Sequence, residues 1–155
     1  MKIASCTLAG RTGHEAGLAL LAALYREETG EELPPIAVKE RGKPYFPHSS
    51  WHFSISHTRR RAFCALSRRE IGIDAEELDR DVPLALARKV LSPGEMAQLD
   101  AVPDKRRALL TFWVLKEAQA KYTGEGLRGY PNKTDFSLDD PRVTEMDGCL
   151  VAVVE

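Results

Sequence analysis

Three acidic side chains carry the clearest chemical signal in this sequence. Asp74 and Glu76 lie two residues apart in a run that predicts a strand, and Glu117 continues the apolar stripe of a predicted helix. Because side chains alternate faces along a strand, the first two share one face, about 6–7 Å apart. This spacing suits Mg²⁺, which binds one or two carboxylates together with water and phosphate oxygens. Alone, the pair is equally compatible with a solvated acidic face.

The helical spacing around Glu117 strengthens the case for a bound cation. Leu110, Trp113 and Val114 precede it by seven, four and three residues, so Glu117 lies on the apolar face, and Lys121 follows one turn later. The alternative is a Glu–Lys helix pair worth about 0.2–0.5 kcal/mol, which fits a solvated face better. A buried carboxylate without a partner stays protonated, whereas a nearby cation keeps it ionised. We therefore expect the three acids to bind a divalent metal.

The segment before position 48 predicts three regular elements and one loop. A weak alternation indicates a strand, and apolar side chains at helical spacing indicate a helix that ends at Gly30. A second short strand follows, and glycine and proline then punctuate a loop. The predicted elements are strand 2–8, helix 13–29, strand 36–41 and loop 41–47.

Three strand-like runs come next, at 52–57, 62–67 and 70–76. Because their links are only four and two residues long, an antiparallel meander is the simplest topology. The first and third strands of a meander run in the same direction. We therefore expect His57, at the end of the first strand, to lie at the same end of the sheet as the acidic pair.

The second half of the chain predicts mainly helices. Ser92 is expected to cap one of them, with Glu95 reaching back to the cap. The final 30 residues indicate a loop and one or two strands, including Cys149–Val154. No linker divides the chain, so we expect a single α+β domain over residues 1–155, with an antiparallel sheet packed against helices. The predicted helices are 83–91, 93–101 and 105–122.

Composition excludes several classes of protein. The chain has 22 Lys and Arg against 23 Asp and Glu, which argues against a dedicated nucleic-acid binder. Its three cysteines are far apart, so they indicate neither a disulfide framework nor a zinc site. No apolar run approaches the roughly 18 residues of a membrane helix, and the first residues do not resemble a signal peptide. We expect a cytoplasmic protein that binds neither nucleic acid nor membrane.

Five motifs, taken together, resemble the Sfp-type 4′-phosphopantetheinyl transferases. Their order and spacing agree with the family over about residues 40–127, and a fainter match covers 11–30. The strand motif and the helix motif are highly specific in combination, and the resemblance implies the α+β fold of this family. The motifs are Gly42-Lys43-Pro44, Phe53-Ser54-Ile55-Ser56-His57-Thr58, Gly72-Ile73-Asp74-Ala75-Glu76, Leu91-Ser92-Pro93-Gly94-Glu95 and the run from Phe112-Trp113 through Lys116-Glu117-Ala118 to Lys121.

The resemblance implies a transfer reaction and its metal. Members move the phosphopantetheine arm of coenzyme A onto a serine of an acyl or peptidyl carrier protein and release adenosine 3′,5′-bisphosphate. In the family's pattern, the positions of Asp74, Glu76 and Glu117 hold Mg²⁺ against the pyrophosphate. The Glu117 position, or a water near it, is thought to take the serine proton. Charge that builds on the phosphoryl oxygens in such a reaction is stabilised mainly by metal and lysine.

The same resemblance assigns residues to coenzyme A, the expected co-substrate. The positions of Lys43, His57 and Lys121 meet its phosphates, and Lys121 joins Glu117 as a catalytic residue. Without the family pattern, Lys43 is a solvated loop lysine and His57 a hairpin-end histidine bonded to backbone. Three further features keep two interpretations each: Glu95 is functional or only a capping residue, Arg59–Arg61 dock an acidic carrier or form a solvated turn, and Gly124–Gly126 approach a phosphate or end the helix.

The chain departs from the family in length. Sfp-type enzymes commonly have two similar halves with coenzyme A bound between them, whereas this sequence has a motif-bearing core at about 40–127 and a reduced N-terminal half at 1–40. Either the coenzyme A cleft is open and binds its ligand weakly, or another subunit supplies the missing wall. The second alternative implies a homo-oligomer. The alternative function is a non-catalytic, truncated homologue that binds a carrier protein or nucleotide.

Overall fold

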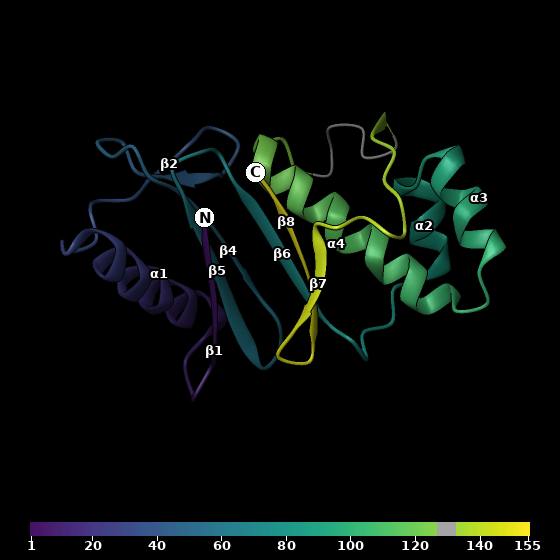
Figure 1. Cartoon of the computed structure of the whole chain (residues 1–155), viewed down its shortest axis with the longest axis horizontal. Helices are drawn as coiled ribbons and strands as arrows, with labels where there is room; N and C mark the ends of the chain where they lie inside the picture. Colours follow the sequence, from purple (N-terminus) through teal and green to yellow (C-terminus); the bar gives the residue numbers. More distant parts are fainter. Residues whose placement is uncertain (127–132) are drawn as a thin grey trace.

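The protein is built from four layers, with a helix on each outer face of two packed sheets (Figure 1). The computed structural model describes residues 1–126 and 133–155. Helix α1 (Gly13–Thr29) covers the first sheet and helix α4 (Lys105–Thr123) covers the second. The first sheet has the order β1-β5-β4 and the second the order β6-β8-β7. Their strands are β1 (Lys2–Thr7), β4 (His52–His57), β5 (Arg61–Ser67), β6 (Gly72–Glu77), β7 (Val143–Met146) and β8 (Cys149–Val154).

Strand alternation explains how two helices and two sheets stack. In β5, Cys64 and Leu66 face α1, whereas Phe63 and Ala65 face the second sheet, where they pack with Ile73. The other face of the second sheet, which includes residues of β8, packs against α4 in the largest core cluster. Strand β5 therefore needs apolar residues on both faces, and it is buried from residue 62 to residue 67.

The expected meander is wrong at its third strand. Strands β4 and β5 pair antiparallel as predicted, but β6 pairs with β8 rather than with β5. The apolar face of β6 stacks on the first sheet instead of joining its edge, and β8 supplies the hydrogen-bond ladder. The expected direction nevertheless holds: the amides of Ile73 and Ala75 donate to the hydroxyls of Ser54 and Ser56, so β4 and β6 lie side by side and run the same way.

The helices agree with the sequence prediction to within a residue or two at each end. Helix α2 spans Leu84–Val90 and α3 spans Pro93–Ala101, and both pack at one end of α4 (Figure 1). A capping box joins Ser92 to Glu95 as expected, and Gly124 ends α4 in the left-handed conformation, with φ of 74°. Among the described residues, no helix is both long and apolar enough to cross a bilayer.

The prediction for residues 36–47 needs correction. The strand expected at 36–41 shrinks to β2 (Ala37–Val38), and the expected loop contains its partner β3 (Pro44–Tyr45), so a small hairpin holds Lys43. The last segment agrees with the prediction of a loop and one or two strands, because β7 and the expected strand Cys149–Val154, β8, form a hairpin. Asp147 and Gly148 connect these strands with φ of 52° and 76°, as a tight two-residue hairpin turn requires.

Candidate active site

The acidic strand β6 faces α4 at very short range. Adding a Cβ atom to Gly72 would place it 2.1 Å from the carbonyl oxygen of Ala118, so no other residue fits there. Asp74 and Glu76 follow on the same face, with relative exposures of 6% and 9%. The strand period thus directs both carboxylates toward α4, as the sequence predicted, and the glycine permits the contact.

Glu117 meets these carboxylates from α4. Its side chain is partly buried, and burial raises its pKa to about 7. The Asp74 carboxylate adds to this increase, Glu76 contributes less, and the Lys121 ammonium opposes it. The three acids that the sequence singled out therefore lie close enough to influence each other's charge. A carboxyl group with this pKa exchanges protons readily near neutral pH.

Asp74 is only half satisfied. Its Oδ1 accepts hydrogen bonds from the Ser56 hydroxyl at 2.9 Å and from the Lys121 ammonium at 2.8 Å. Its Oδ2 is buried, and no donor in the described parts of the chain reaches it. Lys121 also donates to the carbonyl of Ile55 at 3.4 Å. The predicted proximity of Lys121 to the acids is confirmed, although its ion pair is with Asp74 rather than with Glu117 one helical turn away.

Glu76 is held by two donors. The Trp113 indole N–H donates to its Oε1 at 3.1 Å, and Arg80, four residues later, forms an ion pair with the same oxygen. Trp113 was expected in the apolar stripe and in the helix motif but not as a donor to Glu76, and Arg80 was not expected in the site. The four-residue spacing between Glu76 and Arg80 was the available signal. Such a spacing predicts an ion pair within a helix, whereas here it spans the end of β6 and the turn that follows.

The described residues include no group of three or more His, Cys, Asp or Glu side chains arranged to hold a metal ion. Two observations nevertheless fit a cation here: the buried Asp74 Oδ2 without a donor and the raised pKa of Glu117. Oxygen donors of this kind match the preference of Mg²⁺. The metal assignment of the three acids therefore stays a prediction, with protein cations now lying beside two of them.

His57 and Glu76 line the same cavity, which has a volume of about 580 Å³. Since β4 and β6 run in the same direction, the ends of both strands open into it. Gly13, at the start of α1, packs directly on the histidine ring: a Cβ there would lie 2.3 Å from the His57 Cγ. The structure thus places His57, at the end of β4, near the end of β6 that carries Glu76, as expected. The start of α1 packs against the His57 ring.

Lys43 lies on the other side of the acids. It contributes to a cavity of about 290 Å³ whose walls also include Glu117 and Lys121. Its ammonium is nevertheless occupied: it donates to the carbonyls of Tyr122 at 2.6 Å and Ile71 at 3.3 Å, and it pairs with Glu70. Burial lowers the pKa of Lys43, and Glu70 opposes this effect. The assignment of Lys43 to a phosphate remains a prediction that requires these contacts to exchange.

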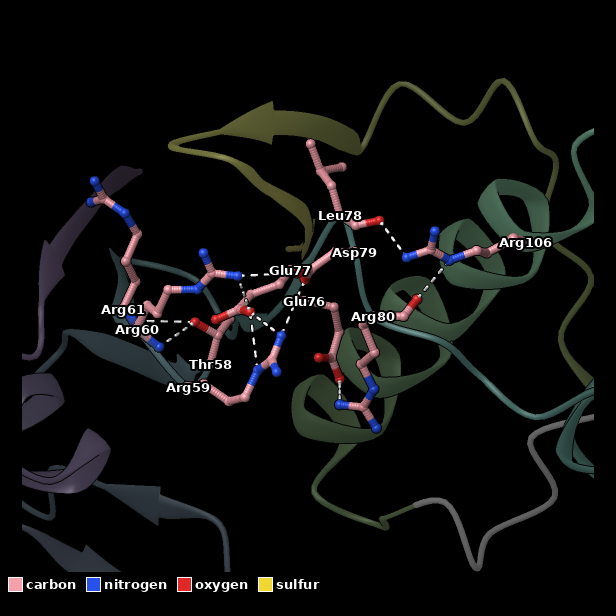
Figure 2. Close-up of polar contacts among 10 residues, drawn as sticks. All are labelled: Thr58, Arg59, Arg60, Arg61, Glu76, Glu77, Leu78, Asp79, Arg80 and Arg106. Carbon is pink, nitrogen blue, oxygen red and sulfur yellow. Dashed lines mark hydrogen bonds and ion pairs between the residues drawn. The ribbon is translucent and has the colours of Figure 1, made fainter.

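The structure gives the contacts of two features that kept two interpretations each, Glu95 and the arginine turn. Glu95 accepts from the backbone N–H groups of Ser92 and Phe136, both at 2.9 Å, and pairs with Lys116 at 2.8 Å, so its contacts are those of a structural residue. Arg59 and Arg60 both bind the buried Glu77 carboxylate at the cavity rim (Figure 2). The turn they form is therefore ion-paired within the chain rather than freely solvated.

Comparison with known proteins identifies the family of this chain. The family model of the 4′-phosphopantetheinyl transferase superfamily matches residues 70–148, which include both acidic motifs. The chain belongs to this superfamily. It is 38% identical over 93 residues to a 4′-phosphopantetheinyl transferase of Bacillus subtilis, covering 58% of this chain and 41% of the relative.

Two further relatives show the same extent of similarity. The transferase HetI of a Nostoc species is 37% identical over 97 residues, covering 57% of this chain and 41% of its own length. Sfp of Bacillus subtilis strain 168 is 36% identical over 95 residues, covering 59% and 42%. The chain therefore matches about two fifths of the length of these relatives.

Proposed function

We propose that this protein transfers the 4′-phosphopantetheine arm of coenzyme A to a serine of an acyl or peptidyl carrier protein, in a reaction that depends on Mg²⁺. The observation that carries the proposal is the meeting of Asp74, Glu76 and Glu117 between β6 and α4, within the matched family region. The relatives are named for this transfer, and the acids they would need occupy one site here.

The three acids would hold the Mg²⁺ ion. The bound ion would neutralise the pyrophosphate of coenzyme A and stabilise charge on its oxygens. The buried Asp74 Oδ2 without a donor supports this assignment, because an unpaired carboxylate oxygen in a low-dielectric site is costly without a cation. The raised pKa of Glu117 supports it as well, since the repulsion from Asp74 is relieved when positive charge lies between the two.

Lys121, His57 and Lys43 would bind the phosphates. Lys121 already reaches the acids from α4, and Lys43 lies on the same cavity wall as Lys121. His57 lines the neighbouring cavity with Glu76. Coenzyme A would therefore run along the β4–α4 side of the protein, with its pyrophosphate at the acids between the two cavities.

Glu117 would act as the general base. The carrier serine oxygen attacks the phosphorus that carries the pantetheine arm, and its proton passes to the Glu117 carboxylate. The new serine–phosphate bond forms as the bond from that phosphorus to the bridging oxygen breaks, and adenosine 3′,5′-bisphosphate leaves with the bonding electrons. In the metal-free site the pKa of Glu117 is about 7, and a bound cation would lower it and keep the carboxylate ionised to accept the serine proton near neutral pH. Lys121 would stabilise the negative charge that develops on the phosphoryl oxygens.

A mass-resolved transfer assay tests the proposal. Purified protein is mixed with coenzyme A, Mg²⁺ and several apo carrier proteins, and each carrier is weighed by mass spectrometry. We expect at least one carrier to gain one phosphopantetheine, and we expect Asp74→Ala to abolish the gain while the far-UV circular dichroism stays unchanged. Asp100→Ala, an exposed acid of α3, is the matched control and should transfer normally.

Two outcomes would count against this function. If every apo carrier stayed unmodified while a known transferase modified the same samples, the transfer activity would be wrong. If calorimetry then showed carrier binding without coenzyme A binding, the non-catalytic alternative would replace it. A folded Asp74→Ala variant with full activity would instead remove the metal role of this residue alone.

A further inference from the structure

Arg80 lies in the acidic site although it belongs to none of the motifs that define the site. It follows β6 and pairs with the Oε1 atom of Glu76, the same oxygen that accepts the Trp113 indole hydrogen bond (Figure 2). Figure 2 draws the Arg80–Glu76 pair, and the Trp113 ring, which is not drawn there, has its centroid 5.7 Å from the guanidinium carbon. The side chain is 45% exposed, so it reaches the carboxylate from the solvent side.

The backbone around Arg80 is held in place by several hydrogen bonds. The Arg80 amide donates to the carbonyl of Glu77 at 2.8 Å, which closes a tight turn directly after β6. Arg106 of α4 donates to the carbonyls of Leu78 and Arg80, at 3.3 and 3.4 Å (Figure 2). These hydrogen bonds attach the turn to α4 and keep the Arg80 side chain within reach of Glu76.

A second group of charged residues contacts the turn that follows β6. Arg59 and Arg60, from the link between β4 and β5, each bind both Glu77 and Asp79 at 2.7–3.2 Å (Figure 2). The Arg60 guanidinium, followed by that of Arg59, lowers the pKa of Glu77 to about 2 against the opposing effect of burial. These two arginines have their own acidic partners, and within residues 1–126 and 133–155 the cation that pairs with Glu76 is Arg80.

A guanidinium and a divalent cation cannot share one carboxylate oxygen at contact distance without strong repulsion. We propose that Arg80 is a resident counter-ion of Glu76 and that it competes with the divalent cation for this carboxylate, which lowers the affinity of the free protein for the metal. This inference rests on the proposed function, because the metal site is the one assigned there. It adds a residue that controls how readily that site is loaded.

The contacts of Asp74 and Glu76 explain why the competition involves Glu76. Asp74 keeps its Oδ2 free of donors while Lys121 and Ser56 bind its other oxygen. Glu76, in contrast, already has the Arg80 guanidinium on its Oε1, so a metal bound to either oxygen of this carboxylate meets a positive charge at close range. Since Arg80 is partly exposed and lies in a turn, its side chain can leave without disturbing the core.

Metal binding in the absence of coenzyme A tests the inference. The full chain is treated with EDTA and dialysed, and Mn²⁺ is then titrated while free Mn²⁺ is followed by electron paramagnetic resonance. We expect Arg80→Gln to bind Mn²⁺ about 3- to 10-fold more tightly than the unmodified protein, because removal of an ion pair and of a repulsive charge favours the metal. Arg80→Lys, which keeps the charge, should stay close to the unmodified protein.

Two control variants separate the possible failures. Arg60→Gln removes the same charge from a nearby turn, but Arg60 contacts Glu77 and Asp79 rather than Glu76, so the Mn²⁺ affinity should change less than about twofold. Asp74→Asn should weaken binding. If Asp74→Asn weakens binding but Arg80→Gln leaves it unchanged or weakens it, the inference on Arg80 is overturned and the metal site stands. If Asp74→Asn has no effect, the metal site of the proposed function is overturned, and the inference with it.

Discussion

Lys116 and Glu117 are consecutive residues of α4, yet their charges have opposite surroundings. Lys116 points into the core of the helical end of the protein, where its side chain is 1% exposed and pairs with Glu95 at 2.8 Å. Glu117 points toward β6, where burial and the neighbouring Asp74 raise its pKa to about 7. The first charge is fully buried and matched, whereas the second is partly buried and opposed by like charge.

The environment of Glu95 shows what a structural carboxylate looks like in this protein. It is 0% exposed, and it accepts hydrogen bonds from two backbone amides as well as the lysine pair. Lys116 in turn donates to the carbonyl of Thr134. This network ties α3 and the segment after α4 to one position of the helix. Asp74, by comparison, keeps a buried oxygen without a donor.

This difference separates structural from functional charge. A buried pair that satisfies all of its groups stabilises one conformation and leaves nothing for a ligand to bind. A group of carboxylates that repel each other and leave a buried oxygen without a donor costs stability unless a positive charge binds, and such perturbed groups concentrate at functional sites. Substituting Glu117 or Lys116 and measuring both activity and stability tests this difference.

Glu117→Gln should have the largest effect, which is a loss of activity. Removing the proposed base should lower carrier modification by about 10²–10⁴-fold, equivalent to about 3–5 kcal/mol of transition-state stabilisation, with no loss of folded structure. Initial rates of transfer are measured by mass spectrometry and the fold by circular dichroism. Glu27→Gln, an exposed change on α1, serves as the control. A glutamine variant with more than a tenth of the normal rate would contradict the role as base.

Lys116→Met should have a comparable effect, but on stability. It leaves the Glu95 charge buried without its ion-pair partner, which costs about 3–5 kcal/mol. Urea unfolding of the variant and the unmodified protein measures the difference. The double variant Glu95→Gln with Lys116→Met buries no charge and should recover part of the loss. A destabilisation below about 1 kcal/mol in the single variant would show that the pair is not the structural element that we describe.

The smallest effect is the pH dependence of stability that Glu117 itself produces. Its folded pKa of about 7 lies above the ordinary 4.5, so the folded state holds the proton more strongly and loses stability as pH rises from 4.5 to 7. Glu117→Gln cannot ionise and avoids this loss. In EDTA, its stability should match the unmodified protein below pH 4.5 and exceed it by about 1–2 kcal/mol above pH 7, after allowance for solvent screening.

Urea unfolding at pH 4, 5.5 and 7.5 tests this window. The expected gap opens across the series because the carboxyl group of the unmodified protein ionises in the unfolded state first. A gap of the same size at all three values would mean that the substitution acts through packing rather than through charge. The exposed variant Glu27→Gln should show no gap at any of these pH values.

Local sequence signals predicted the helices and their ends well. Ser92 with Glu95 forms the expected capping box, and Gly30 and Gly124 end α1 and α4 in the left-handed conformation. These features depend on contacts within four residues, so a single stretch of sequence contains the information. The same holds for the faces of β6 and α4, whose periods put Asp74, Glu76 and Glu117 on inward-facing positions.

The strand pairing could not be obtained in this way. Short links made the β4–β5–β6 meander the simplest topology, but β6 pairs with β8, more than 70 residues later in the chain. Nothing in the sequence of β6 distinguishes an edge of the first sheet from a separate sheet stacked on it, because an apolar face is required in both. The direction of β6 relative to β4 survived because two alternating serines of β4 bind its backbone.

The sequence by itself determined which carboxylates and cations are chemically suited to a shared site, because residue type and helical or strand period are local properties. Only the tertiary structure decided how these charges are satisfied. It directed Lys121 to Asp74, enclosed Lys43 among carbonyls, matched Glu95 with Lys116 and turned Arg80 back onto Glu76. Each of these outcomes depends on distances of a few ångströms between segments far apart in the chain or joined by an irregular turn, where periodicity gives no guidance.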